Sequence, residues 1–327
     1  MGQASFAENM GRTLETGNLI DLVAAGPLPH AHFGPDVQRA REFALVRLRE
    51  DLASERLQSW AAHRDGAEVV IVASAQAWDS EQLGLGCGRL DWILWTGPSP
   101  TVESLIGGLR GTVEQWCREQ DIALLSCKMA TADLPVVHAL QAWSMRLIDC
   151  EVIWSIDAAA ARPEVEPSGF VIEQVQGRDI DGIGDLGKVF TLDRFHADDR
   201  IDDHRADRLW AASLQNACAY RADQVIIARV GKRVIGAVTC FIDRDAAYYL
   251  SEPVCDFLHV VVDPVWRGRG VGVVMLDRAI AWAGLRTRYA QVGTQVRNYA
   301  ANGLYRKAGF SLVGSQYSLH GHQQCEK

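Results

Sequence analysis

Apolar and polar residues recur along the chain with two periods, which divide most of it into strands and helices. Short segments with alternating apolar residues predict strands, and longer segments with apolar residues three or four positions apart predict helices. In the C-terminal half, the predicted elements are a strand at Phe170–Val175, a helix within Asp179–Phe190, a helix near Ala206–Ala219, strands at Gln224–Val230, Val234–Ile242 and Phe257–Val262, a helix at Val271–Ala283, a strand at Tyr289–Val296, a helix at Asn298–Ala308 and a strand near Ser311–His320. This order is typical of an α/β fold.

The N-terminal half contains a similar but shorter order of elements. The predicted elements are a strand at Arg89–Leu94, a proline-containing turn at Thr96–Pro100, a helix at Val102–Glu119, a strand at Ile122–Cys127, a helix at Asp133–Trp143 and a strand at Leu147–Ile156. When Ala142–Met145 is aligned with Lys307–Phe310, Leu140 stands opposite Tyr305. An internal duplication with one inactive copy explains this order, and a second, unrelated α/β domain is the alternative.

The length of 327 residues predicts two domains. Residues 161–169 contain two prolines among small and charged residues and end in glycine, which is typical of a linker. We therefore expect one domain over residues 1–160 and a second over residues 170–327.

Composition places the protein among ordinary globular chains, with 48% apolar and 23% charged residues. The sequence has no apolar run of about 18 residues and no N-terminal signal pattern, so we expect no membrane partner and a cytoplasmic location. The eight cysteines are at least ten residues apart, which excludes paired-cysteine metal motifs and predicts reduced thiols. His320, His322 and Cys325 are expected to belong to a disordered polar tail, and no metal site is predicted.

A turn rich in glycine and arginine follows the predicted strand Phe257–Val262. Its glycines at 268, 270 and 272 directly precede or begin the predicted helix. A turn with so few side chains can direct several backbone N–H groups at an anion, at the positive end of the helix. A phosphate-bearing ligand therefore fits it. The sequence lacks the Lys-Ser/Thr pair of a P-loop and the later acidic residue of a dinucleotide-binding motif.

Charge is distributed unevenly along the chain. The net charge is −8, but residues 263–310 contain eight basic and two acidic residues, so this segment carries +6 and the remainder −14. A basic segment in an acidic protein suits a polyanionic small molecule, and the acidic remainder disfavours nucleic acid as a partner. Arg267 and Arg269 are expected to contact phosphate, whereas Arg278, Arg286 and Arg288 are expected to be solvated surface residues.

Two motifs follow one another in this basic segment. The first is Arg267-x-x-Gly270-x-Gly272, and the second, about thirty residues later, is Asn298-x-x-Ala301-x-x-Leu304-Tyr305-x-x-x-Gly309-Phe310. Together they resemble the motifs of the GCN5-related N-acetyltransferase (GNAT) superfamily, over approximately residues 170–320. The resemblance implies an α/β GNAT fold with a mixed central sheet that takes up acetyl-CoA at mid-sheet. It also makes the N-terminal half a candidate degenerate GNAT-like domain, which we expect to bind no CoA.

The resemblance implies roles for individual residues. Tyr305 matches the general acid that protonates the leaving CoA thiolate. Binding of acetyl-CoA as cosubstrate is implied for Val260, Val262, Arg267, Gly268, Arg269, Gly270, Val271, Gly272 and Asn298. The acceptor amine is mostly protonated at neutral pH and must lose a proton before it attacks the thioester. His259 is the candidate base, with Asp256 and a water path as alternatives.

A second resemblance concerns the acceptor. The loop Asp193–Asp203 occupies the region that shapes the acceptor site in GNAT enzymes, so Arg194 and Arg200 are candidate substrate contacts. A resemblance to bacterial dTDP-fucosamine N-acetyltransferases is carried by Trp78-Asp79-Ser80-Glu81-x-x-Gly84 and by Asp199-Arg200-Ile201 followed by Leu209-Trp210 and Asn216. This implies that the acceptor is the amino group of a nucleotide-linked deoxysugar. Gln82-Leu83 departs from the aromatic pair of that family, which leaves the acceptor open.

Two alternatives to an amino-sugar acetyltransferase remain. In the first, the acceptor is a peptide or another small-molecule amine. In the second, the protein is a non-catalytic CoA-binding sensor. Asn298 and Tyr305 argue against the sensor, because a sensor needs no general acid. The sequence also leaves a homodimer open.

Overall fold

The computed structural model describes residues 16–26, 30–53, 57–160, 168–177 and 180–323. By its internal contacts the chain divides into two compact units. Unit 1 comprises residues 1–148 and 316–327, and unit 2 comprises residues 149–315. Residues 161–167 of the expected linker lie outside the described residues.

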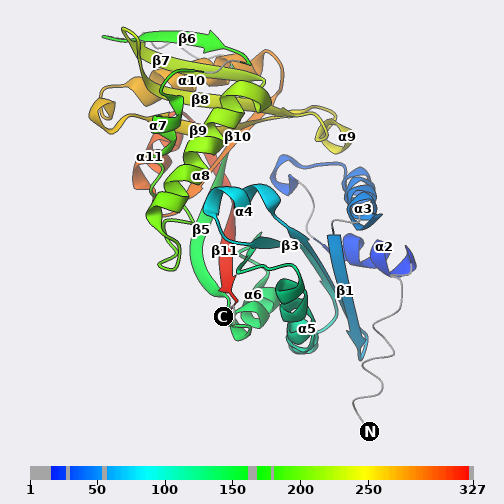
Figure 1. Ribbon diagram of the computed structural model, residues 1–327. Coiled ribbons are helices and arrows are strands. Elements are labelled where there is room, and N and C mark those ends of the chain that lie inside the picture. Colours follow the sequence, from blue (N-terminus) through cyan, green and yellow to red (C-terminus); the bar gives the residue numbers. More distant parts are fainter. Residues whose placement is uncertain (1–15, 27–29, 54–56, 161–167, 178–179, 324–327) are drawn as a thin grey trace. The chain divides into compact units, whose positions relative to one another are not determined.

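Unit 1 is built on a mixed sheet with the strand order β1-β2-β3-β4-β11, in which β3 and β4 are parallel (Figure 1). β11 (Ser311–His322) joins this sheet from Gln316 onward. The other elements of unit 1 are α2 (Thr16–Ala25), η1 (Ala31–Phe33), α3 (Val37–Ala53), β1 (Leu57–Arg64), β2 (Ala67–Ala75), α4 (Ala77–Leu83), β3 (Cys87–Thr96), α5 (Ser99–Glu119), β4 (Leu124–Ala130) and α6 (Leu134–Ala142).

Consecutive apolar residues in β2 explain why helices cover both faces of the unit 1 sheet. Val69 and Ile71 pack with residues of α5 and α6, whereas Val70 and Val72 pack with residues of α2 and α3. All four side chains have no exposed surface. Because side chains alternate between the two faces of a strand, such a continuous apolar run predicts burial on both faces.

Unit 2 is built on strands in the order β5-β10-β9-β8-β7-β6, in which β9 and β10 are parallel. Its elements are β5 (Arg146–Asp157), which enters the unit at Asp149, β6 (Val171–Val175), α7 (Ile183–Gly187), α8 (Asp203–Asn216), η2 (Ala217–Arg221), β7 (Gln224–Val230), β8 (Arg233–Asp243), α9 (Ala247–Leu250), β9 (Val254–Val262), η3 (Pro264–Trp266), α10 (Val271–Gly284), β10 (Tyr289–Gln295) and α11 (Tyr299–Lys307).

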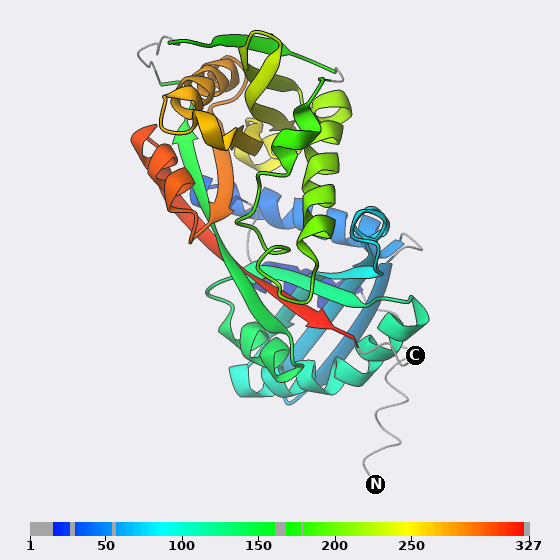
Figure 2. The same cartoon turned by 60° about the vertical axis from the view of Figure 1, so that its left-hand side comes forward.

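Alternation along β7 again assigns the helices of unit 2 to the two faces of its sheet. Ile226 and Ala228 pack in one cluster with residues of α10 and α11. Val225 and Ile227 pack in another with residues of α7 and α8. The helices α8 and α10 therefore cover opposite faces of this sheet (Figure 2).

The two units exchange their last strands. β5 follows α6 of unit 1, but its residues Glu151–Asp157 pair antiparallel with β10 in unit 2. β11 follows α11 of unit 2, but its residues Gln316–His322 pair antiparallel with β4 in unit 1. The compact units therefore differ from the domains expected at residues 1–160 and 170–327, because boundaries drawn along the chain cannot represent an exchange of strands.

Replacing Leu319 with alanine tests this exchange. Leu319 has no exposed surface and belongs to the core of unit 1. We expect Leu319→Ala to lower the free energy of unfolding by about 2–5 kcal/mol, because it leaves a cavity. Hydrogen exchange should show the loss of protection in β3 and β4. The control is Leu312→Ala, because Leu312 lies on the same strand and is 57% exposed. We expect this variant to change the free energy of unfolding by no more than about 0.5 kcal/mol. Lost protection confined to unit 2 would contradict the exchange.

Both units contain the same irregularity beside a short parallel ladder. In unit 2, β9 and β10 pair only at Val254–Asp256, and in unit 1 β3 and β4 pair only at Cys87–Leu90. Just beyond, the register with the preceding strand shifts, which makes Leu258 in β9 and Asp91 in β3 the extra residues of β-bulges. The shared order of elements and the shared bulge support the internal duplication.

Two predicted elements differ from the structure in extent. The helix predicted within Asp179–Phe190 is only the short helix α7, bounded by Gly182 with φ 75° and ending at Gly187. Glycine in these positions favours turns over a continuous helix. The strand predicted to begin at Phe257 begins at Val254.

The disordered polar tail predicted near the C-terminus is wrong for two of its three residues. His320 and His322 lie in β11, opposite Ser126 and Leu124 of β4, and His320 is fully buried. Cys325 lies outside the described residues. The polar composition of this segment concealed a strand whose stability depends on a distant partner.

Candidate active site

The glycine turn connects β9 to α10 through backbone conformations that only glycine adopts without strain. Asp263 ends the strand and accepts a hydrogen bond from Val265 N at 3.0 Å, which caps η3. Gly268 and Gly270 then have φ values of 74° and 83°, and Gly270 is the N-cap of α10. A Cβ atom at either position would meet no protein atom within 4 Å. Both positions therefore border open space at the start of the helix.

Six consecutive backbone N–H groups in this turn and at the start of α10 have no protein acceptor among the described residues. Within the described part of the chain, no backbone or side-chain atom accepts from the N–H groups of residues 268–273, and the first helical bond runs from Val274 N to Gly270 O at 3.0 Å. N–H groups at the start of a helix carry partial positive charge. This arrangement suits an anion such as a phosphate.

The two arginines of the turn have other contacts as well. Arg267 is exposed, and its Nε donates to Val262 O at 3.2 Å. The Arg269 guanidinium lies 5.1 Å from the centre of the Trp266 ring. Both side chains are long and their charges lie at the surface, so they can also approach an anion held at the turn.

The strand that leads into the turn has a free edge. Among the described residues, the β9–β10 ladder ends at Asp256 and Gln291, so the β10-facing edge of residues 257–262 has no ladder partner. Val260 and Val262 pack toward the core formed with α10 and α11. An extended ligand with amide groups can hydrogen-bond to such an edge as an added strand does.

Tyr305 belongs to the same core as this edge. It lies on α11, is 3% exposed, and packs in one cluster with Phe257, Val260 and Val262. Burial raises the pKa of its phenol, so the hydroxyl stays protonated at neutral pH. The structure therefore places Tyr305 in the same core as the strand β9, whose free edge leads into the glycine turn.

Two asparagines fix the helix that carries Tyr305. Asn298 is the N-cap of α11: its Oδ1 accepts from Ala301 N at 3.2 Å, and its Nδ2 donates to Thr294 Oγ1 at 3.1 Å. Asn302 was not singled out from the sequence. Its Nδ2 donates to Asn298 O at 2.9 Å, and its Oδ1 accepts from Trp154 Nε1 at 2.8 Å. Asn298 therefore has a capping function in addition to any contact with a ligand.

His259 lies on the opposite face of the sheet from Tyr305. It is 5% exposed, and both ring nitrogens meet hydroxyl groups: Nδ1 lies 2.9 Å from Thr239 Oγ1 and Nε2 lies 3.1 Å from Ser213 Oγ. Burial, assisted by the positive charge of Arg221, lowers the pKa of His259 to about 4. The imidazole is therefore neutral at neutral pH, with both nitrogens occupied.

Asp256 has the properties of a base in this region. It lies at the end of the β9–β10 ladder, beside the bulge, and its Oδ1 accepts from Gln291 Nε2 at 2.5 Å. Burial raises its pKa to about 6, against the opposing effect of the Gln291 hydrogen bond. A carboxyl group with this pKa is ionised at neutral pH and can still take up a proton efficiently.

The loop expected to contact the acceptor is held by a buried ion network. His196 Nδ1 lies 2.5 Å from Asp193 Oδ2, and His196 Nε2 lies 3.3 Å from Asp207 Oδ1 on α8. Arg297, next to the N-cap of α11, donates to Asp193 O at 3.1 Å. The network therefore connects the loop to α8 and to the start of α11. In the sequence, this network was indicated only by the spacing of Asp193 and His196, which are three residues apart.

The two predicted substrate contacts lie in this loop but differ in environment. The Arg194 guanidinium stacks on the Phe195 ring at 4.6 Å, whereas Arg200 is exposed. The backbone N–H of Arg200 donates to Asp198 Oδ1 at 3.2 Å. Arg200 is thus the more accessible of the two for a charged ligand.

We expect the anchoring of this loop to depend on pH through His196. Burial alone would lower the pKa of His196, but the hydrogen bonds and charges of Asp193 and Asp207 outweigh it and raise the pKa. A raised folded pKa means that the stabilisation is complete below the unfolded value of about 6.5 and is lost as the pH rises through the folded value. Exchange protection factors of residues 195–201 should therefore fall across that interval, and NMR titration should place the pKa of His196 above 6.5.

A matched pair of variants checks this expectation. His196→Gln should remove the pH dependence of the protection factors, whereas His204→Gln, at an exposed position at the start of α8, should retain it. The same pH dependence in His196→Gln as in the unmodified protein would contradict the assignment.

The described part of unit 1 lacks the glycine turn of this site. α5 begins after Pro98 and has Pro100 in its first turn, so proline replaces N–H groups at the position of the glycine turn. Trp95 Nε1 on β3 donates to Asp133 Oδ1, the N-cap position of α6, at 2.9 Å. This indole therefore connects β3 to the start of α6. In the alignment of the two halves of the sequence, Leu140 stands opposite Tyr305.

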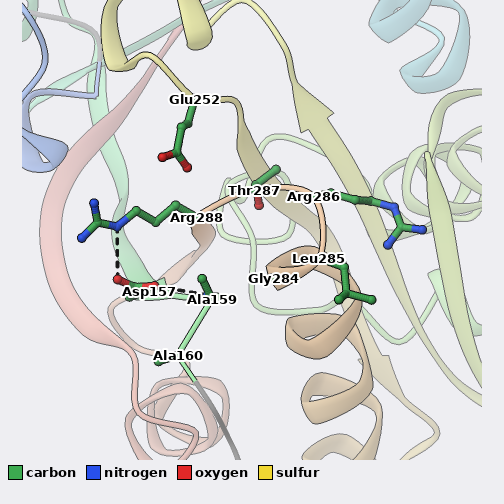
Figure 3. A pocket seen from close by; sticks show the side chains of 9 residues that line it. All are labelled: Asp157, Ala159, Ala160, Glu252, Gly284, Leu285, Arg286, Thr287 and Arg288. Carbon is green, nitrogen blue, oxygen red and sulfur yellow. Dashed lines mark hydrogen bonds and ion pairs between the residues drawn. The ribbon is translucent and has the colours of Figure 1, made fainter.

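A pocket of about 470 Å³ lies elsewhere in unit 2, at the C-terminal end of α10 (Figure 3). Arg288 Nε lies 3.3 Å from Asp157 Oδ2 in its wall, and Arg286 points away from this pair, donating to Trp282 O at 2.9 Å. These contacts agree with the prediction that both arginines are surface residues. No residue predicted to bind acetyl-CoA lines this pocket.

Comparison with known proteins identifies the family of this site. Residues 190–310 match the model of the acetyltransferase (GNAT) family. No curated protein matches the sequence. None of the described helices has both the length and the apolar character needed to span a membrane.

Solved structures with a similar fold extend over both units. A GCN5-related N-acetyltransferase from Sphaerobacter thermophilus is 13% identical, with 96% of this chain and 95% of that chain covered and a TM-score of 0.57. A tandem GNAT protein from the clavulanic acid biosynthesis pathway is 13% identical, with 95% and 96% covered and a TM-score of 0.53. A GCN5-related N-acetyltransferase from Kribbella flavida is 11% identical, with 85% and 94% covered and a TM-score of 0.50.

At these identities the similarity concerns the fold, and it confirms the predicted α/β GNAT fold with a second GNAT-like unit before it. Residues 190–310 contain the two motifs, the glycine turn and Tyr305. This segment matches the acetyltransferase (GNAT) family model, within a chain of tandem GNAT-like architecture.

Proposed function

We propose that the protein is an N-acetyltransferase that moves an acetyl group from acetyl-CoA to a primary amine in unit 2. The observation that carries this proposal is the row of six N–H groups at residues 268–273, at the start of α10, that have no acceptor in the described part of the chain. They follow a strand whose edge is free of a ladder partner there. The N–H groups suit the pyrophosphate of CoA, and the edge suits its amide-containing arm. The match of residues 190–310 to the GNAT family model supports acetyl transfer in general.

Binding in this orientation would direct the thioester toward the divergence of β9 and β10. The residues near this point would then carry the chemistry. The amine attacks the thioester carbonyl, the C–S bond breaks, and the CoA thiolate takes a proton. Tyr305 is the proposed donor of that proton, because its phenol is protonated and lies in the core beside the same strand.

The base that deprotonates the amine has two protein candidates. His259 was the first candidate from the sequence, but both of its nitrogens are bonded to hydroxyl groups and its pKa is lowered to about 4. Asp256 has a pKa raised to about 6 and lies at the end of the ladder. We therefore favour Asp256, with a path of water molecules as the remaining alternative.

The acceptor we propose is the amino group of a nucleotide-linked deoxysugar. Its support is the resemblance of residues 78–81 and 199–201 to dTDP-fucosamine N-acetyltransferases, together with the exposed position of Arg200, which can pair with a phosphate. A peptide or another small-molecule amine is the alternative acceptor. A CoA-binding sensor is the alternative from a different class.

Two measurements on the full chain test the proposal. Calorimetric titration should give one acetyl-CoA per chain, because unit 1 lacks the turn. A thiol-release assay should then show turnover with a panel that contains dTDP-amino sugars, simple amino sugars, peptides and alkylamines. Binding without turnover on any amine would favour the sensor, and no binding would exclude both functions.

A further inference from the structure

The surroundings of His259 contain hydrogen-bond donors that the mechanism above does not use. Phe190 and Trp210 lie against the imidazole, with ring centres at 5.8 and 6.2 Å. Ser213, one turn of α8 after Trp210, reaches its Nε2, and Thr239 reaches its Nδ1. The position of one ring proton decides which of these groups remain available.

The imidazole carries one proton, because burial keeps His259 neutral. Thr239 is fully buried, and its Oγ1 already accepts from the backbone N–H of His259 at 3.1 Å. If Nδ1 also donated to Oγ1, the hydroxyl hydrogen of Thr239 would have no acceptor in a fully buried position, which is unfavourable. Thr239 therefore donates to Nδ1, and the ring proton lies on Nε2.

This assignment leaves the hydroxyl hydrogen of Ser213 available. Nε2–H donates to Ser213 Oγ, so Ser213 acts as an acceptor toward His259, and its own hydrogen has no acceptor among the described residues. The indole Nε1–H of Trp210 is buried and likewise has no acceptor among them. The two residues are three positions apart on α8 and contact the same imidazole, so both donors lie on one face of the helix.

The two donors lie beside the reaction site of the proposed function. His259 directly follows the bulge residue Leu258, within the part of β9 that has no partner on β10. The free edge there is where the acetyl arm is proposed to bind. α8 covers the face opposite to Tyr305, so a group bound at Trp210 and Ser213 approaches the thioester from the side away from the general acid.

Trp210 and Ser213 supply two donors, one N–H and one O–H. Such a pair favours an acceptor such as an oxygen over a protonated amine, which can only donate. The positive charge of Arg221, which acts on His259, also disfavours an ammonium group. Building on the proposed acetyl transfer, we propose that Trp210 and Ser213 bind an oxygen of the acceptor, so that the enzyme selects amines that carry a hydroxyl, carbonyl or carboxylate oxygen near the amino group. Thr239 is a positioning residue, because it acts only through the tautomer of His259.

Selectivity between paired amines tests this proposal on the full chain. Glucosamine and glycinamide serve as oxygen-bearing probes, and cyclohexylamine and ethylamine as their oxygen-free counterparts. Trp210→Phe retains an aromatic ring and removes the N–H, and Ser213→Ala removes the hydroxyl. Each should lower the ratio of kcat/KM for oxygen-bearing over oxygen-free amines by about 3- to 10-fold, the effect of one hydrogen bond.

Trp143→Phe is the matched control. Its indole Nε1–H is also buried without an acceptor among the described residues, but it lies in unit 1. The selectivity ratio should not change in this variant. An unchanged ratio in both Trp210→Phe and Ser213→Ala would overturn the proposal.

Indole NMR separates this proposal from the proposed function. The Trp210 Nε1–H signal, assigned by its loss in Trp210→Phe, should shift on addition of glucosamine and not of cyclohexylamine. A shift without any turnover would support oxygen binding while excluding acetyl transfer. Turnover without a shift would exclude the oxygen site alone.

Discussion

Replacing Gly270 with valine is expected to abolish acetyl-CoA binding. Gly270 is the N-cap of α10, with φ 83°, and a Cβ there would enter the open space faced by the N–H groups of residues 268–273. A branched side chain fills the volume that a pyrophosphate needs, and it also disfavours the left-handed conformation that directs the N–H groups inward. A Kd on the order of 1 μM should rise by at least about 100-fold, to about 0.1 mM or weaker.

A second glycine controls for backbone strain. Gly231 lies in the β7–β8 hairpin turn with φ 58° and open space at its Cβ. Gly231→Val therefore introduces a similar local strain outside the glycine turn. Thermal unfolding should show a comparable loss of stability for the two variants, whereas calorimetry should show lost acetyl-CoA binding for Gly270→Val alone. Unchanged affinity in a folded Gly270→Val variant would refute the role of the turn.

The features that the sequence predicted well are those that neighbouring residues determine. The order of β9, the glycine turn and α10 follows from an apolar strand, a proline, three glycines and an apolar helix that lie consecutively. Glycines at 268 and 270 were predicted to leave space, and both have the positive φ angles that this requires. Local conformational preferences were sufficient here.

The partners of β5 and β11 could not be predicted in the same way. Alternation predicts that a segment is a strand and which residues share a face, but it does not identify the neighbouring strand. Both segments follow a short helix and would fit next to the strand that precedes it. The exchange therefore becomes visible only in the registers of β5 with β10 and of β11 with β4.

The chemistry around His259 was uncertain for a related reason. Simple alternation along β9 would place residues 257 and 259 on one face, but the extra residue Leu258 sends Phe257 toward α10 and His259 toward α8. A one-residue bulge has no clear signature in this strand. Ser213 and Trp210, which complete the surroundings of His259, come from a helix more than forty residues away in the sequence. Leu209-Trp210 belongs to the second family resemblance, but nothing in the sequence placed Trp210 or Ser213 beside His259.

Replacing Tyr305 with phenylalanine is expected to lower kcat while leaving acetyl-CoA binding nearly unchanged. The variant keeps the ring that packs 5.8 Å from Phe310 and within the core of unit 2. It removes only the hydroxyl, whose pKa is raised by burial and which is therefore protonated throughout the neutral range. A contact needed only in the transition state should affect the rate and not the ground-state affinity.

The size of the effect distinguishes proton donation from packing. Loss of a general acid lowers the rate by about 10²- to 10⁴-fold, and because a thiolate is a good leaving group we expect the lower end of this range. Tyr317→Phe, which removes a hydroxyl next to the core of unit 1, should retain full turnover. If Tyr305 only packs, Tyr305→Phe will also retain it, because phenylalanine preserves the buried ring. Single-turnover rates, measured where acetyl transfer limits them, therefore decide whether the hydroxyl of Tyr305 acts on the leaving thiolate.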